Sequence, residues 1–93
     1  MPATVKEVLA KALVILDRDG WCQGTATNEK GQHCMIGLVG QANKEMNNDV
    51  LSQGAPDVIR MVIGSRVIAD WNDAPVRTID DVRAVLARAM ESA

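Results

Sequence analysis

The sequence predicts an all-α fold, a compact bundle of about four helices, and three observations support this. Apolar residues recur every three or four positions along most of the chain, which is the period of a helix with one buried face. Helix start signals precede three of these stretches, and short polar turns separate them. The 93 residues, 47% of them hydrophobic, suit a single helical domain over residues 1–93. Its core must be aliphatic, because two Trp are the only aromatic residues.

The first helix is predicted over residues 5–19. Thr4 and Glu7 have the spacing of a capping box, in which each side chain bonds the backbone amide of the other residue. Gly20 supplies the positive φ that commonly ends a helix. The apolar residues behind the box share one helical face: Val5, Val8, Leu9, Ala12, Leu13 and Leu16.

A short loop or a small hairpin is predicted between the first and second helices, over residues 21–33. The segment Asn28–Gly31 has the composition of a tight turn closed by glycine. The arms on either side are too short to make a stable hairpin alone, so both forms stay open.

The second helix is predicted from Cys34 to about Met46, where the helical period returns. Its apolar face consists of Met35, Leu38, Val39, Ala42 and Met46. Beside that face, Cys34, Gly37 and Gly40 repeat every three residues. An interior Gly costs a helix about 1 kcal/mol relative to Ala. The two glycines therefore predict that another backbone packs closely against this strip.

A third helix is predicted to start near Pro56 and Asp57, since both residues favour the first turn of a helix. The apolar run Val58–Ile63 is accordingly predicted to be helical, although a buried strand would have the same pattern. A short helix or turn is expected over residues 66–71, and a polar connection over residues 70–75.

The last helix is predicted over about residues 79–91. Thr78 and Asp81 form a second capping box, with Asp in the position of Glu. Its apolar face consists of Ile79, Val82, Val85, Leu86, Ala89 and Met90.

Charge and hydropathy exclude several classes of function. Ten Lys and Arg against twelve Asp and Glu leave no basic patch, so a nucleic-acid partner is not expected. No apolar run approaches the roughly 20 residues of a membrane span, and no secretory signal is visible. We therefore expect a cytoplasmic protein without a membrane partner or cofactor, whose cysteines are thiols.

Cys22, His33 and Cys34 form the first group of reactive residue types. As metal ligands they would need a fourth partner, and adjacent His and Cys cannot easily face one ion, so no metal site is expected. A Cys nucleophile with His33 as base and Asn72 or Asp73 as orienting group is a further alternative, as is a Cys22–Cys34 disulfide. No catalytic signature surrounds either Cys, so small buried thiols are favoured. His33 is expected to be a solvated loop residue.

The two Trp residues mark a candidate binding surface. Trp21 follows the first helix and Trp71 precedes the last, each beside short polar side chains. If these helices run antiparallel, the two segments meet in one cluster, and a buried indole N–H finds an acceptor on Asn72 or Asp73. Turn chemistry or core packing would explain the same residues without a function. The candidate surface comprises Trp21, Cys22, Gln23, Trp71, Asn72 and Asp73.

Three motifs stand out along the chain: Gly-Trp-Cys-Gln-Gly over residues 20–24, Cys-Met-Ile-Gly over residues 34–37, and a Trp-Asn-Asp segment over residues 68–78. Together they resemble a family of small proteins of unknown function encoded by bacteria and their phages. Two positions depart from the family pattern, because Asp19 replaces a usual His or Arg and Leu38 replaces a usual Ala. The resemblance implies that the Trp-Cys-Gln and Trp-Asn-Asp residues belong together, and it implies no particular reaction.

The sequence favours a non-enzymatic module that acts by binding another protein, because few titratable groups gather on a small rigid scaffold. If the chain is phage-encoded, as the resemblance suggests, a host factor is the expected partner and toxicity to the host the expected effect. The alternatives are a Cys-dependent hydrolase using Cys22, His33 and Asp73, and a small-ligand module at the two-Trp surface. A homodimer is also expected, since Val58–Ile63 is apolar on more faces than a thin bundle buries.

Overall fold

Five helices make up most of the computed structural model, which describes residues 3–48 and 54–93. They are α1 (Val5–Asp19), α2 (Met35–Glu45), α3 (Gly54–Ile63), α4 (Ile68–Asn72) and α5 (Ile79–Ser92). No strand occurs in these two stretches. The all-α prediction is confirmed, and the predicted count of about four is one too few because α4 is a helix of its own.

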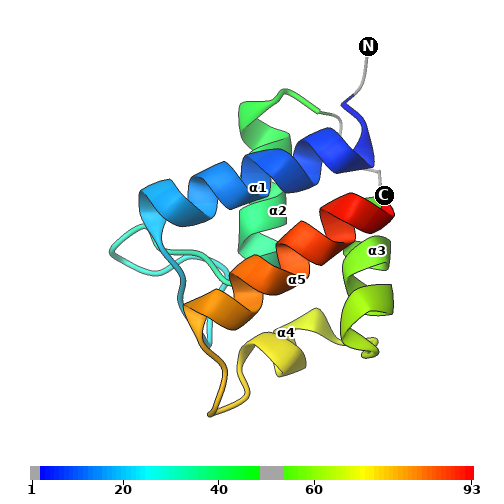
Figure 1. Cartoon of the computed structure of the whole chain (residues 1–93). Helices are drawn as coiled ribbons and strands as arrows, with labels where there is room; N and C mark the ends of the chain where they lie inside the picture. The colour runs from blue at the N-terminus through cyan, green and yellow to red at the C-terminus, as the bar shows by residue number, and fades with distance from the viewer. Residues whose placement is uncertain (1–2, 49–53) are drawn as a thin grey trace.

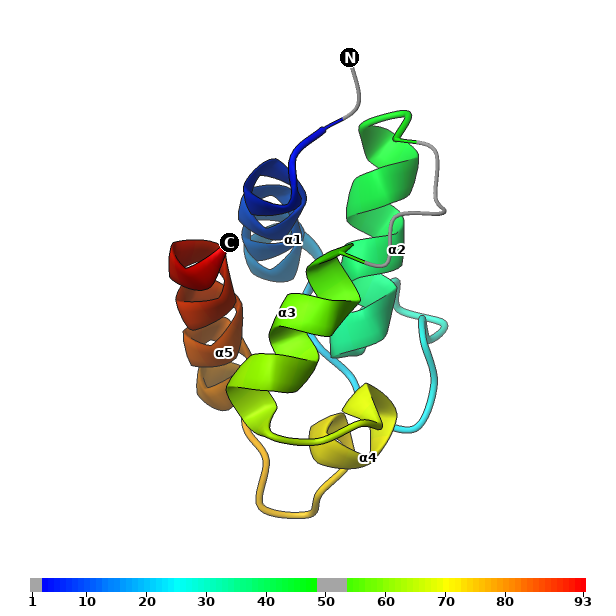
Figure 2. The same ribbon diagram turned by 90° about the vertical axis from the view of Figure 1, so that its right-hand side faces the viewer.

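The longest two helices, α1 and α5, lie side by side and run in opposite directions (Figure 1). α2 packs on α1, and α3 packs mainly on α5 (Figure 1). In Figure 2, α3 lies between α5 and α2, and α4 lies at the base beside the loop of residues 20–34. The antiparallel α1 and α5 bring the end of α1 and the start of α5 to the same side of the molecule, as the sequence predicts.

The core is aliphatic, as the composition predicts. Its largest fully buried side chains are Val8, Leu9, Ile15, Leu16, Met35, Leu38, Ile59, Val82 and Leu86. Trp21 and Trp71 are partly buried and pack against the edge of this cluster. The two rings therefore border the core and do not fill its centre.

Side-chain caps fix the helix ends where the sequence places them. Thr4 and Glu7 make both bonds of the first capping box, and Thr78 and Asp81 make both bonds of the second. Gly20, with φ of +92°, follows the last residue of α1. Because of these local signals, both predicted limits of α1 and the predicted start of α5 are correct. The end of α5, predicted at about residue 91, lies one residue later, at Ser92.

The two glycines on α2 have different surroundings. A Cβ on Gly37 would collide with the carbonyl oxygen of Ala26, so the loop backbone does lie against α2 there. A Cβ on Gly40 would meet nothing within 4 Å. Close backbone packing is therefore confirmed at Gly37 and wrong at Gly40.

One connection takes one of its two predicted forms, and a second connection differs from its prediction. The backbone pairing of strand type within the loop of residues 20–34 is limited to two isolated bridges, from His33 to Trp21 and from His33 to Thr27. The hairpin alternative is therefore not formed. Its Asn28–Gly31 turn is present, since the Gly31 amide donates to the Asn28 carbonyl at 3.0 Å. The predicted polar connection of residues 70–75 is wrong at its start, because residues 70–72 complete α4.

The run Val58–Ile63 is helical, as predicted.

None of the helices in the described stretches has both the length and the apolar character needed to cross a bilayer.

Candidate functional site

Asn72 joins three separate segments through its side chain. Its Oδ1 accepts from the Trp21 indole Nε1 at 2.6 Å and from the Met35 backbone amide at 3.0 Å. Its Nδ2 donates to the Cys22 carbonyl at 3.1 Å and to Asp73 Oδ1 at 3.0 Å. Asn72 has no exposed surface. An amide side chain with all four bonding positions used and no access to water is a structural link.

Gln23 and Asp73 extend this link across the surface. Gln23 Nε2 donates to the carbonyls of Asn72 and Ala74, each at 3.0 Å. The Gly24 amide donates to Asp73 Oδ1 at 3.0 Å. Hydrogen bonds from the Asn72 side chain and the Gly24 amide lower the pKa of Asp73. We call Trp21, Gln23, Asn72 and Asp73 the Asn72 junction.

The structure thus brings together most of the candidate residues. The predicted acceptor for the Trp21 indole N–H is confirmed, and it is Asn72. Cys22 joins the junction through its carbonyl oxygen, and its thiol takes no part. Trp71 is attached through its neighbour Asn72, while its own ring faces a different group.

That group is Arg77, which the sequence reasoning missed. Its guanidinium carbon lies 3.7 Å from the centre of the Trp71 ring, and its Nε donates to the Trp71 carbonyl at 2.8 Å. A turn closed by the Arg77 amide and the Ala74 carbonyl, at 2.9 Å, folds the chain back onto α4. Pro75 within that turn is the one sequence signal for this return.

Two exposed aliphatic residues lie close to Trp71 and Arg77 in the sequence. Val76, in the turn, is 82% exposed, and Val67, just before α4, is 50% exposed. We call Val67, Trp71, Val76 and Arg77 the Trp71 surface. These residues belong to α4 and to the segments just before and after it, and α4 and its connection to α5 lie at the base of the molecule in Figure 1.

The two cysteines are free thiols, so the disulfide alternative is wrong. Cys34 is buried and caps α2, its Sγ accepting from the Gly37 amide at 3.4 Å. Cys22 is half-buried, and its Sγ donates to the carbonyls of Gln32 at 3.3 Å and Thr25 at 3.5 Å. Burial raises the pKa of the Cys22 thiol. A thiol held in its protonated form by burial and two carbonyls is a poor nucleophile.

His33 is buried at 4% exposure, so its prediction as a solvated loop residue is wrong. Its Nδ1 lies 2.9 Å from Thr27 Oγ1, and its Nε2 lies 3.0 Å from Asp19 Oδ2. Both ring nitrogens therefore have partners, which is what allows a histidine to be buried. Neither partner is Cys22, so the expected Cys–His pair of a hydrolase is not formed.

Asp19 connects this histidine to the surface charges of α1 and α2. Arg18 binds Asp19 through two bonds of 2.8 Å and reaches Glu45 at 2.7 and 2.9 Å. The hydrogen bonds from Arg18, and to a smaller extent the one with His33, hold the pKa of Asp19 well below its usual range. Arg18 and then Gln41 lower the pKa of Glu45 to about 2.

Acid is therefore expected to destabilise the protein through this network. A carboxyl whose pKa is lower in the folded than in the unfolded chain adds stability above its unfolded pKa and loses it as the pH falls toward its folded pKa. The urea concentration at the unfolding midpoint should therefore decrease as the pH is lowered from about 5 to about 2. Arg18→Gln should make that fall shallower, because the folded pKa values of Asp19 and Glu45 return toward normal. Equal slopes for both proteins would contradict this role of Arg18.

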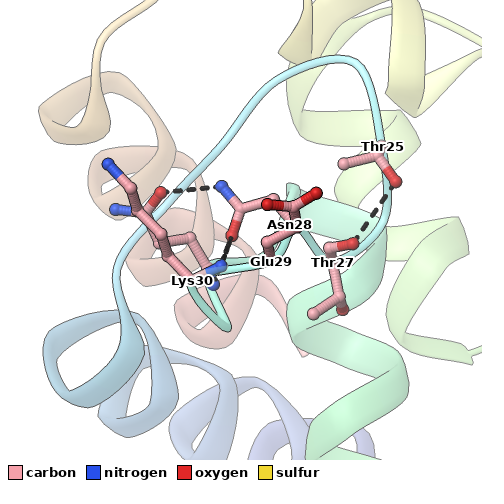
Figure 3. Close-up of a pocket in the computed structure, with 6 residues that line it drawn as sticks. Thr25, Thr27, Asn28, Glu29 and Lys30 are labelled. Atoms are coloured by element: carbon pink, nitrogen blue, oxygen red, sulfur yellow. Dashed lines mark hydrogen bonds between the residues drawn. The ribbon is translucent and has the colours of Figure 1, made fainter.

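The loop of residues 20–34 also carries a surface hollow of about 510 Å³. Figure 3 shows the polar side chains that line it. Some of them bond within the loop: Thr25 Oγ1 donates to the Thr27 carbonyl at 3.4 Å, and Asn28 Nδ2 donates to Gln32 Oε1 at 2.8 Å (Figure 3). All of the residues that line the hollow are polar or charged, whereas hydrophobic and aromatic side chains typically line small-molecule sites.

No group of three or more His, Cys, Asp or Glu residues suited to a metal ion occurs in residues 3–48 and 54–93.

Comparison with known proteins places the chain in a family. The family model described as a family of unknown function (DUF6197) matches residues 1–92, so the chain belongs to that family. This agrees with the resemblance to a family of unknown function drawn from the motifs. No curated protein and no solved structure matches the chain.

Proposed function

We propose that this DUF6197 member is a non-enzymatic module that binds another protein through the Trp71 surface. If the chain is phage-encoded, as the motifs suggest, the proposed partner is a host protein.

The observation that supports this proposal is the stack of Arg77 on Trp71, in a segment that also carries two exposed valines. Trp and Arg dominate the residues whose loss most weakens protein interfaces. Exposed aliphatic side chains next to them supply area that gains free energy when a partner covers it. The Asn72 junction holds α4 against the loop of residues 20–34, so the surface is rigid before binding, which lowers the entropic cost of association.

The cysteines favour binding over catalysis and give a direct test. Cys22 is expected to react with a disulfide reagent at pH 8 more slowly than a thiol in an unfolded peptide, because burial raises its pKa. Cys34, which is 5% exposed, should react only after unfolding. Thiol titration with and without urea measures both rates. A native thiol that reacts faster than the unfolded one would favour the hydrolase alternative.

Site-specific photocrosslinking tests the proposed surface. A photoreactive residue is placed at position 76 or, as the control, at position 61. Val76 and Met61 are each 82% exposed, so the two probes are equally accessible. Met61 lies on α3, in a groove shared with Arg88 and Ser92 near the far end of α5, roughly 20 Å from the α5 start.

In cells that naturally contain the protein, position 76 is expected to give a discrete crosslinked product that position 61 does not give. Added wild-type protein should suppress that product, and the V76D variant should not. The same product from both positions, or from neither, would contradict the proposal.

The predicted homodimer is a separate proposal, and α3 is the surface that would form it. Val58, Met61 and Val62 of α3, together with Arg88 and Ser92 of α5, line a groove of about 260 Å³ on that side. A crosslink from position 61 at about twice the 10.0 kDa mass of the chain would support self-association. Sedimentation of the wild type as a single 10.0 kDa species at micromolar concentration would contradict it.

A further inference from the structure

Arg77 is held in place before any partner arrives. Its Nε bond to the Trp71 carbonyl and its stacking on the Trp71 ring fix the plane of the guanidinium. A free arginine side chain would lose conformational entropy when it binds, and much of that loss has already occurred here.

The fixed guanidinium has no carboxylate partner within the described residues. Arg18, Arg60 and Arg83 each bind at least one carboxylate at 3.0 Å or less, whereas Arg66 and Arg88, like Arg77, have no such partner in residues 3–48 and 54–93. For Arg77, neither Asp70 on α4 nor Asp73 just after it comes within ion-pair distance. Because Nε is used by the Trp71 carbonyl, the two terminal nitrogens are left as a planar pair of donors. That pair matches the two oxygens of a carboxylate.

Two exposed valines flank the stacked residues in the sequence. Val76 adjoins Arg77 in the chain, and Val67 lies one helical turn before Trp71. The Trp71 indole N–H has no acceptor in the described part of the chain. Because no buried side-chain nitrogen or oxygen is left without a partner there, this N–H reaches solvent. The Trp71 surface thus combines a fixed cation, a free donor and two exposed aliphatic groups.

We infer that the Trp71 surface binds a peptide segment of the partner in which an acidic residue stands beside an aliphatic one. The carboxylate bonds the terminal nitrogens of Arg77, and the aliphatic side chain packs on Val76 and Val67. This inference rests on the proposed function and adds the chemistry of its partner. Binding of a nucleic-acid backbone is disfavoured, since the surface offers one such arginine and the whole chain has a net charge of −2.

A displayed library of random peptides about twelve residues long, selected on the full-length protein, tests the inference. The selected peptides should be enriched in Asp or Glu next to Leu, Ile or Val. R77Q should weaken the best peptide by about 10- to 100-fold, as for loss of a charge-assisted bond, and M61D should leave its affinity unchanged. Replacing the acidic residue of the peptide by its amide should weaken binding to the wild-type protein by a similar factor. This measurement remains informative even if R77Q does not fold.

The other outcomes separate the two proposals. Peptides that lack acidic enrichment, or whose affinity R77Q does not change, would overturn the carboxylate inference. If V76D still abolished their binding, the Trp71 surface would stand as a protein-binding site. Tighter binding of a phosphoserine peptide than of its Asp counterpart, by tenfold or more, would overturn the inference in favour of a phosphopeptide. Failure to select any peptide would overturn it as well.

Discussion

Replacing Asn72 with alanine is expected to lower the free energy of unfolding by about 3 kcal/mol, a large effect for one polar side chain. The change removes the partners of the Trp21 indole N–H, the Met35 amide and the Cys22 carbonyl. A buried polar group left without a partner costs about 1–3 kcal/mol. Urea denaturation followed by Trp fluorescence and by circular dichroism measures the loss.

Asp73→Ala is the matched control, because Asp73 belongs to the same junction but is exposed. Its loss of stability should be clearly smaller, since water can replace its bonds to the Gly24 amide and the Asn72 side chain. An unchanged urea midpoint for Asn72→Ala would show that the junction does not hold the fold. Its residues would then have to be explained by binding alone.

Gly37→Ala is expected to destabilise the protein by about 2–3 kcal/mol, although alanine is the better helix former. The new methyl group would overlap the carbonyl oxygen of Ala26, which also accepts from the Cys34 amide at 3.0 Å. The loop cannot move away without weakening that bond. Overpacking against backbone costs more than the propensity of alanine returns.

Gly40→Ala, three residues further along α2, is expected to change the stability in the opposite direction. Nothing lies within 4 Å of its added Cβ, so the substitution should stabilise the protein by about 0.5–1 kcal/mol. Thermal melts of the two variants beside the wild type test both effects at once. Higher melting temperatures for both variants would mean that helix propensity, and not contact with the loop, decides both positions.

Local chemistry explains why the helices were predictable from the sequence. Capping boxes such as that of Thr4 and Glu7 specify their own helix start, because all of the bonds lie within four residues. For α4 the sequence predicts either a short helix or a turn, since its Asp-Trp-Asn composition is typical of a turn as well. Its helical form depends on packing against α2 and α3, which no local pattern records.

The candidate site was predictable only in part, for the same reason. The need of a buried indole N–H for an acceptor was enough to predict a bond to Asn72 or Asp73 if α1 and α5 run antiparallel, and in the structure the acceptor is Asn72. The burial of His33 was missed because its partners, Asp19 and Thr27, share no regular spacing with it. Arg77 was missed because stacking on a ring six residues earlier depends on the shape of a turn.

The Asn72 junction also has a consequence for the order in which the protein folds. The bonds from Asn72 to Trp21 and Cys22 join residues about fifty positions apart, whereas the capping boxes close over three. Contacts of such long sequence separation form after the chain has largely collapsed, so we expect the junction to be absent from the folding transition state. Asn72→Ala should then speed unfolding while leaving the folding rate nearly unchanged. Stopped-flow refolding and unfolding in urea separate the two rates, and a slower folding limb would show that the junction forms early. The contact that joins the two Trp-bearing segments is thus expected to set how long the folded molecule lasts once formed.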